Sequence, residues 1–267
     1  MKKFILIPII LVLTAVLVVS AVFISSYYNE SHKQKSKYDE LASLVETSPE
    51  TSSTSSEKST TNPDTDFDYV DDDTDTTEDQ KLNYRDLPLL NPDTVGWIRI
   101  DNTAINYPVV QSKANPNYYL NHNFYKQESV YGCPFVQDNC DANKPTDNVV
   151  IYGHHMNDGS MFAELANYSS YDFYTDHKFI QFDTLHENHR YEVLAAFKTE
   201  AQTGFRYYSF VNASSDADYN AFISKCKSLS YYDTGVTAKN GDKLITLSTC
   251  DNISSGGRIV VVAKQIS

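Results

Sequence analysis

Close to its start, directly after Lys2 and Lys3, the chain has a long uncharged and mainly apolar run, Phe4 to Ile24. An α-helix rises about 1.5 Å per residue, so this run forms a helix of roughly 30 Å, enough to cross the hydrocarbon core of a bilayer. The apolar part of a cleaved signal peptide is usually shorter, about 7 to 15 residues, and no Ala-x-Ala site follows here. We therefore predict a retained membrane anchor in residues 1–30, with a cleaved signal peptide as the alternative.

The charges around this run leave its orientation open. Three lysines lie just beyond it and oppose the two at its start, under the rule that positive flanks stay inside the cell: Lys33, Lys35 and Lys37. An exported C-terminal portion is expected mainly because of the segments that follow.

Residues 81–267 alternate short runs of Val, Ile, Tyr and Phe with Asn, Asp and Gly, a pattern typical of many short β-strands. Strands are predicted at Gly96–Asp101, Ile105–Gln111, Asn148–Tyr152, Phe179–Phe182, Arg190–Thr199, Lys243–Ser248 and Arg258–Lys264. Many strands with few helices indicate a mainly β domain. Periodicity alone does not choose between a closed barrel and a sandwich.

Three stretches of this domain are predicted to be helical. Ser160–Ala166 begins with serine and has a glutamate soon after, which is a helix-start signal. Asp216–Leu229 places four side chains on one face: Tyr219, Phe222, Ile223 and Cys226. Leu82–Leu90 forms a further helix that stops at Asn91 and Pro92.

Charge is concentrated between these two parts of the chain. Glu46–Gln80 holds twelve acidic residues and one lysine, Lys58, and so carries −11 of the formal net charge of −13. Like charges and few apolar residues prevent such a segment from burying enough surface to offset its chain entropy. We predict a disordered extracellular linker over residues 31–80, followed by a catalytic domain at 81–267. The charge balance indicates no nucleic-acid partner.

Cys250 ends an apolar strand pattern and is the candidate nucleophile of the domain. A thiol attacks an acyl carbonyl as thiolate, and a neighbouring imidazolium or guanidinium lowers its pKa enough to supply that form. A lone cysteine is more often a buried apolar filler. Two further residues favour the catalytic interpretation: His154, after the strand that ends at Gly153, and Arg258, which opens the last strand.

His154 is the candidate acid and base, with His155 as its competitor. Side chains alternate along an extended backbone, so one of the two faces a cleft at this strand end. Paired histidines also suggest a metal, but the spacing typical of metal ligands is missing, and neither a metal nor a cofactor is expected. Burying the Arg258 guanidinium is unfavourable unless it pairs with an anion, such as a tetrahedral oxyanion. The alternative is that Arg258 is an exposed arginine at the start of a strand.

These segments together resemble the class B sortases, which have a histidine after Tyr-Gly, a Thr-Leu-x-Thr-Cys strand end and an arginine opening the last strand. The similarity extends over most of Leu82–Ser267, including Asn91–Val110. It implies an eight-stranded sortase-type β-barrel with a few peripheral helices. The anchor and the acidic spacer also match the layout of this family.

The resemblance implies a cysteine transpeptidase on the outer face of a Gram-positive cell membrane, without a cofactor. Cys250 would cleave a sorting motif of secreted surface proteins after Thr, and the thioacyl enzyme would transfer to an amine of a peptidoglycan precursor or a pilin. His154 would move the protons, and Arg258 would hold the oxyanion or the sorting peptide. Three further residues match positions that line the peptide groove of the family: Ser248, Tyr152 and Leu120.

The remaining cysteines depart from what the resemblance requires. Cys133 and Cys140 are close in sequence and could form a disulfide outside the cell, although spacing does not prove it. Cys226 lies on the apolar face of a predicted helix and is expected in the core.

Other functions stay open at this stage. A cysteine peptidase would resolve the thioacyl enzyme with water, and a non-enzymatic surface binding module would leave Cys250 unreactive. The L,D-transpeptidases also use cysteine and histidine, but LSTCDN lacks the glycine and the adjacent arginine of their motif.

Overall fold

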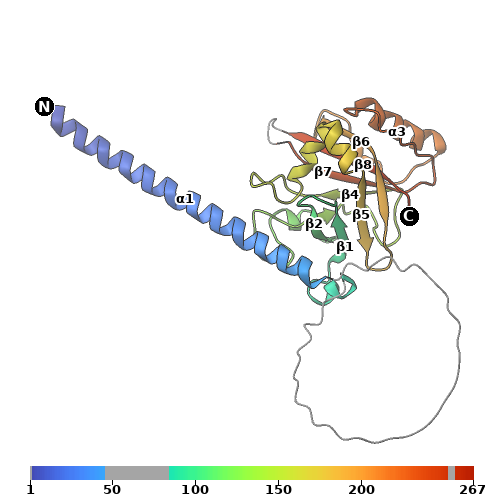
Figure 1. Ribbon diagram of the computed structural model, residues 1–267, viewed down its shortest axis with the longest axis horizontal. Coiled ribbons are helices and arrows are strands. Elements are labelled where there is room, and N and C mark those ends of the chain that lie inside the picture. The colour runs from blue at the N-terminus through green and yellow to red at the C-terminus, as the bar shows by residue number, and fades with distance from the viewer. Residues whose placement is uncertain (1, 46–83, 252–255) are drawn as a thin grey trace, which may run out of the picture.

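The computed structural model describes residues 2–45, 84–251 and 256–267. Its centre is a closed β-barrel of eight strands in the order β1-β2-β3-β4-β7-β8-β6-β5 (Figure 1). The strands are β1 (Thr94–Arg99), β2 (Asn106–Val110), β3 (Phe135–Val136), β4 (Asn148–Tyr152), β5 (Phe179–Thr184), β6 (Arg190–Glu200), β7 (Leu244–Cys250) and β8 (Gly257–Gln265). The expected eight-stranded barrel is confirmed.

Two of the strand pairs, β2–β3 and β4–β7, are parallel, and the others are antiparallel. The parallel alignment of β4 with β7 sends both strands toward the same end of the barrel. Because β8 is antiparallel to β7, it starts where β7 ends. The C-terminal ends of β4 and β7 and the start of β8 therefore meet at one rim.

The central strands β7 and β8 are buried over most of their length because they pack on both faces. Leu244–Thr249 are all buried, as are Ile259–Ala263. Helix α3 (Asp216–Leu229) covers the outside of β6, and its buried face contains the four residues that the periodicity indicated: Tyr219, Phe222, Ile223 and Cys226. Ser215 caps its first turn by accepting from the backbone N–H of Asp218.

Two predicted helices have a different form in the structure. Leu82–Leu90 becomes the 3₁₀ helix η1 (Tyr84–Leu89), and Pro88 inside it provides no N–H for an α-helical bond. Ser160–Ala166 is displaced to η3 (Ala163–Ser169), because Met161 has φ of +57°, a left-handed conformation outside any helix. The other short elements are η2 (Tyr118–Leu120), α2 (Tyr171–Asp176) and η4 (Tyr207–Ser209).

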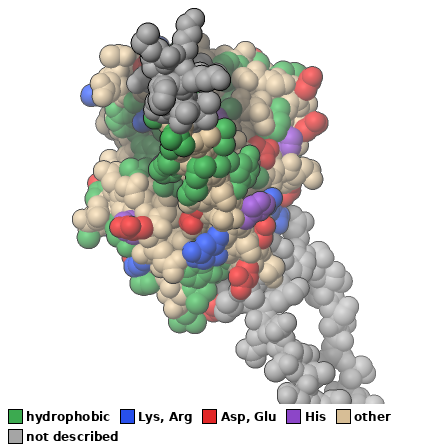
Figure 2. Space-filling view, turned by 90° about the vertical axis from the view of Figure 1, so that its left-hand side faces the viewer, with side chains coloured by type: hydrophobic (Ala, Val, Ile, Leu, Met, Phe, Trp, Pro, Cys, Tyr) green, Lys and Arg blue, Asp and Glu red, His purple; other side chains and the backbone are tan. Residues whose placement is uncertain are grey.

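Helix α1 runs from Lys2 to Leu44 and projects from the barrel (Figure 1). It is the one helix among the described residues whose length and composition suit a membrane crossing, with a mean hydropathy of 2.1 in its most apolar window. Large apolar side chains between Leu11 and Ile24 are exposed. In Figure 2, which faces the side from which α1 projects, hydrophobic side chains form a green patch above lysine, histidine and acidic side chains.

Residues 31–44, which lie within the predicted linker, continue this helix. The acidic stretch of Glu46–Gln80 lies outside the described residues.

Candidate active site

A groove of about 740 Å³ opens at the rim where β4, β7 and β8 meet. Its lining comes from residues at these three strand ends, from the segment around η2 and from the segment around η4. All six predicted site residues line it: Cys250, His154, Arg258, Ser248, Tyr152 and Leu120. The barrel thus brings together side chains from four segments that are up to 138 residues apart.

Cys250 and Arg258 are held next to each other by strand register. Cys250 is the last residue of β7 and is directly paired with Arg258 of β8 across the antiparallel ladder. Directly opposed residues place their side chains on the same face, with Cβ atoms about 5 Å apart. The thiol of Cys250 is exposed, whereas Arg258 is half-buried and donates from Nη1 to the Gly257 carbonyl at 2.9 Å.

His154 reaches the same groove from β4. Tyr152 is paired with Ser248 in the parallel ladder, and the Gly153 N–H continues it by donating to the Ser248 carbonyl at 3.1 Å. The His154 ring is half-buried, and its Nε2 lies 2.7 Å from the carbonyl oxygen of Leu120. A carbonyl oxygen only accepts hydrogen bonds, so Nε2 carries the hydrogen and Nδ1 is left to exchange a proton.

His155 occupies a different position from His154. Its Nδ1 lies 3.0 Å from the backbone carbonyl of Cys250, and it does not line the groove. Its backbone pairs with Met161 in an isolated bridge. The ring of His155 therefore contacts the end of β7 from outside the groove, a role that alternation along the strand did not indicate.

A buried hydroxyl pair supports the floor of the groove. Ser248 is buried, and its Oγ lies 2.6 Å from Tyr207 Oη. Burial raises the pKa of Tyr207, with the Ser248 contact and Arg258 opposing it, so the phenol stays protonated at neutral pH. Tyr152 donates to Gln137 Oε1 at 2.5 Å, and burial raises its pKa as well. The sequence does not point to Tyr207, because no motif connects η4 to β7.

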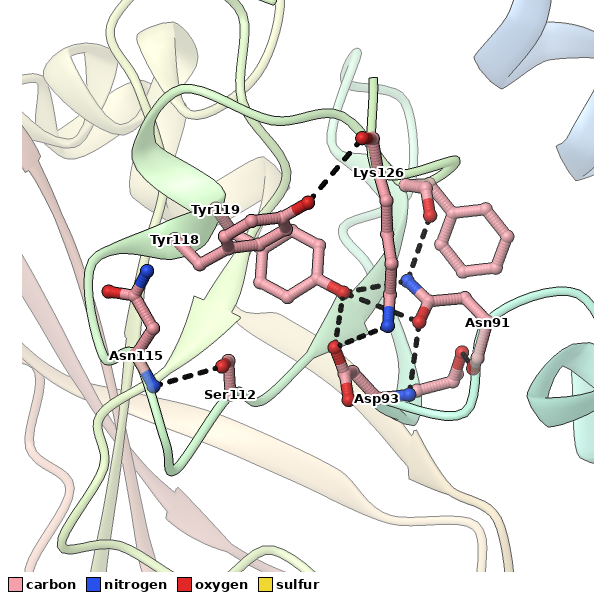
Figure 3. A network of polar contacts seen from close by, with 9 residues as sticks. Asn91, Asp93, Ser112, Asn115, Tyr118, Tyr119 and Lys126 are labelled. Atoms are coloured by element: carbon pink, nitrogen blue, oxygen red, sulfur yellow. Dashed lines mark hydrogen bonds and ion pairs between the residues drawn. The ribbon is translucent and has the colours of Figure 1, made fainter. Parts of the chain in front are cut away.

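The loop that carries Leu120 is held by a partly buried polar network (Figure 3). Asn91 Nδ2 donates to Tyr119 Oη at 2.9 Å, and this hydroxyl donates to Asp93 Oδ2 at 2.7 Å. Lys126 Nζ lies 3.0 Å from the same carboxylate oxygen. Because Tyr119 precedes Leu120, the network fixes the carbonyl that binds His154. The sequence contained no signal for this arrangement.

Two neighbours of Cys250 were also missed. Thr249 is buried, and its Oγ1 has no hydrogen-bond partner among the described residues, although the residue lines the groove. Asp251 is buried and forms an ion pair with Lys198 of β6. This pair ties the residue after the cysteine to the neighbouring strand.

The other three cysteines are buried free thiols. A disulfide between Cys133 and Cys140, which the sequence analysis left open, is not formed. Cys133 Sγ contacts the Pro108 carbonyl and Cys140 Sγ the Asn148 carbonyl, so the two thiols face different parts of the barrel. Cys226 lies in the core as expected. Within the described residues, no group of three His, Cys, Asp or Glu side chains is arranged to hold a metal ion.

Comparison with known proteins identifies the family. The sortase domain model matches residues 98–266. Sortase B of Listeria monocytogenes is 39% identical over 186 residues, which cover 68% of this chain and 74% of that protein.

Two solved structures are similar over the barrel. Sortase B of Bacillus anthracis in complex with AAEK1 has a TM-score of 0.69 and 30% identity, and the match covers 90% of this chain and 99% of that one. A sortase B complexed with triglycine has a TM-score of 0.63 and 36% identity, with 69% and 85% covered. The protein with the groove described above therefore belongs to the sortase family of cysteine transpeptidases, and within it to class B.

Proposed function

We propose that Cys250, His154 and Arg258 carry the transpeptidase reaction in this groove. The observation that supports this assignment is that the three side chains, from three different strand ends, line one groove with Cys250 and Arg258 in direct register. Ser248, Tyr152 and Leu120 line the same groove and would contact the peptide.

The first half of the reaction forms the thioacyl enzyme. The Cys250 thiolate attacks the carbonyl carbon of a threonine in the sorting motif, and the carbonyl oxygen takes the negative charge of the tetrahedral intermediate. The Arg258 guanidinium stabilises that oxygen. The C–N bond then breaks, and protonated His154 gives its Nδ1 proton to the leaving amine.

The second half regenerates the enzyme. Neutral His154 accepts a proton from the incoming amine, whose nitrogen attacks the thioacyl carbon. The C–S bond breaks, the new amide leaves, and the thiolate and imidazolium return. The hydrogen bond to Leu120 holds the ring in one orientation for both transfers.

The acceptor is proposed to be an amine with a small, unbranched chain beside it. The triglycine bound to a solved sortase B supports a glycine amine of a wall precursor, and a pilin lysine is the alternative.

We further propose that the sorting motif belongs to secreted surface proteins and that α1 anchors the domain on the outer face of the membrane. The apolar length of α1 supports the anchoring, and the charges around it do not decide the orientation.

Mass spectrometry of the full chain in detergent, with a library of sorting-type peptides, tests this function. We expect a peptide adduct on Cys250 that is released as a ligated product when triglycine is added. Cys250→Ala should form no adduct, and His154→Ala should form little. If water released the peptide from Cys250 at the same rate with and without triglycine, the protein would be a hydrolytic peptidase. If Cys250 neither formed an adduct nor reacted with iodoacetamide, the domain would be a binding module.

A further inference from the structure

The second half of helix α1 packs on the catalytic domain along one face. Three residues on this face are at most 4% exposed, Gln34, Tyr38 and Leu41, and Val45, directly after the helix, is 8% exposed. The four follow one another at intervals of four, three and four. Such spacing aligns side chains along one side of a helix. Residues 31–45, here called the docked segment, therefore belong to the folded domain, whereas the large apolar side chains between Leu11 and Ile24 are exposed.

The docked segment contacts the backbone that lies against the His154 ring. Tyr38 Oη donates to the Gly132 carbonyl at 2.8 Å. Gly132 has φ of +60°, and a Cβ at this position would lie only 3.1 Å from Cδ2 of His154 and 2.4 Å from the Tyr119 carbonyl. There is thus no room for a side chain at Gly132 beside the imidazole, and the Tyr38 hydroxyl fixes the peptide of this glycine.

A second contact joins the docked segment to the loop after His154. Asp158 Oδ2 accepts from Ser31 Oγ at 2.5 Å and from Tyr131 Oη at 2.7 Å, while its Oδ1 accepts from Ser160 Oγ at 2.6 Å. One carboxylate therefore connects α1, the segment before β3 and the β4–η3 loop. Partial desolvation of the exposed Asp158 opposes its ionisation, but these hydrogen bonds lower its pKa to about 2, so it is an anion at neutral pH.

The far end of the same loop is also connected to Tyr38. The Tyr38 ring packs edge-on against Tyr107, with centroids 5.3 Å apart, and Tyr107 Oη accepts from the Met161 N–H at 3.0 Å. The next residue, Phe162, donates its N–H to the His154 carbonyl at 2.8 Å. The middle and the far end of the β4–η3 loop, and the peptide beside the ring, are thus linked to one helix.

We propose that Ser31 and Tyr38 are positioning residues for His154, so that the helix carrying the apolar run also completes the catalytic site. This inference rests on the catalytic role proposed for His154. A histidine that gives a proton to one amine and takes one from another must keep its position through both steps, and small displacements of a catalytic group are costly. Activity then depends on the docked segment as well as on the barrel.

Kinetics of the full chain in detergent test this inference, with triglycine and the library peptide that acylates Cys250. Tyr38→Phe removes only the hydroxyl, and Tyr28→Phe is its matched control, an exposed tyrosine on the same helix. Ser31→Ala removes the donor to Asp158, and Ser31→Thr keeps one. All rates are measured at a temperature well below the lowest unfolding midpoint among the variants, so that every variant is folded.

We expect Tyr38→Phe to lower kcat about five- to tenfold with KM unchanged, since the Gly132 carbonyl loses its buried donor. Ser31→Ala should lower kcat about two- to threefold, as a partly exposed hydrogen bond allows, and Ser31→Thr and Tyr28→Phe should match the unaltered chain. If Tyr38→Phe and Ser31→Ala both kept the wild-type kcat while His154→Ala was inactive, the positioning role would be overturned and the catalytic assignment of His154 would stand. An active His154→Ala would overturn the catalytic assignment and this inference with it.

Discussion

Gly153→Ala is expected to damage both the stability and the activity of the enzyme, because there is no room for a methyl group directly before His154. A Cβ at Gly153 would lie 2.6, 2.7 and 3.0 Å from Cγ, Cδ2 and Cδ1 of Phe162. Ordinary carbon contacts lie at about 3.5–4.0 Å, so the ring or the strand end must move by roughly 1 Å. Phe162 is fully buried and hydrogen-bonded to the His154 carbonyl, so it cannot retreat freely.

Overpacking of this kind costs about 1–3 kcal/mol of unfolding free energy. A shift of about 1 Å in a catalytic group lowers kcat by up to about 100-fold, so the activity loss should exceed what unfolding explains. Urea denaturation and transpeptidation kinetics of the full chain measure the two effects separately. Because the added methyl group acts by steric overlap with Phe162, Phe162→Leu in the same chain should recover part of the lost unfolding free energy and part of the lost kcat.

A double-mutant cycle over Gly153→Ala and Phe162→Leu gives the decisive result. We expect a favourable coupling of about 1 kcal/mol or more, the size found for residues in direct contact. Strictly additive effects, or a Gly153→Ala chain within about 0.5 kcal/mol of the unaltered one, would refute the reasoning.

Three further predictions concern the site and its surroundings. Arg258→Lys should lower kcat/KM about 100-fold, since a point charge does not reproduce a planar fork of donors; activity within about threefold of wild type would contradict it. Asp158 has a lowered pKa, so its contribution to stability is present above about pH 4 and is lost as the pH falls toward 2. Because the residue is exposed, Asp158→Asn should lower the unfolding free energy, measured by urea denaturation, by about 1 kcal/mol at pH 7 and by almost nothing at pH 2. Thiol titration of the unfolded chain without reductant should count four thiols, and a count of two would show that Cys133 and Cys140 are bridged.

Local sequence pattern predicted most of the barrel. The limits of Asn148–Tyr152 and Asp216–Leu229 agree with β4 and α3, because strong apolar periodicity ends there at clear turn or cap residues. β3 was missed, since a two-residue strand has no periodicity to detect. The helix expected at Ser160–Ala166 begins later, because the contacts of Met161 with Tyr107 impose a left-handed residue that local propensity does not indicate.

The docked segment shows the same limit at larger scale. Residues 31–45 are rich in charged and polar side chains, and this composition predicts that they belong to the linker. Their apolar and amide side chains nevertheless recur along one helix face. Whether such a face is buried depends on a partner surface, here the loops around Gly132 and Asp158, that is far away in the sequence.

The sequence by itself indicated the class of chemistry and the residues proposed to perform it, because the three motifs that carry a thiol, an imidazole and a guanidinium together resemble those of the class B sortases. It also determined the apolar run and the charge of the spacer, which depend on composition alone. Only the tertiary structure decided how the histidine is held: by the carbonyl of Leu120, the peptide of Gly132 and the hydroxyl of Tyr38. These are contacts between backbone groups and side chains from distant segments, and strand register and loop packing create them only when the barrel closes.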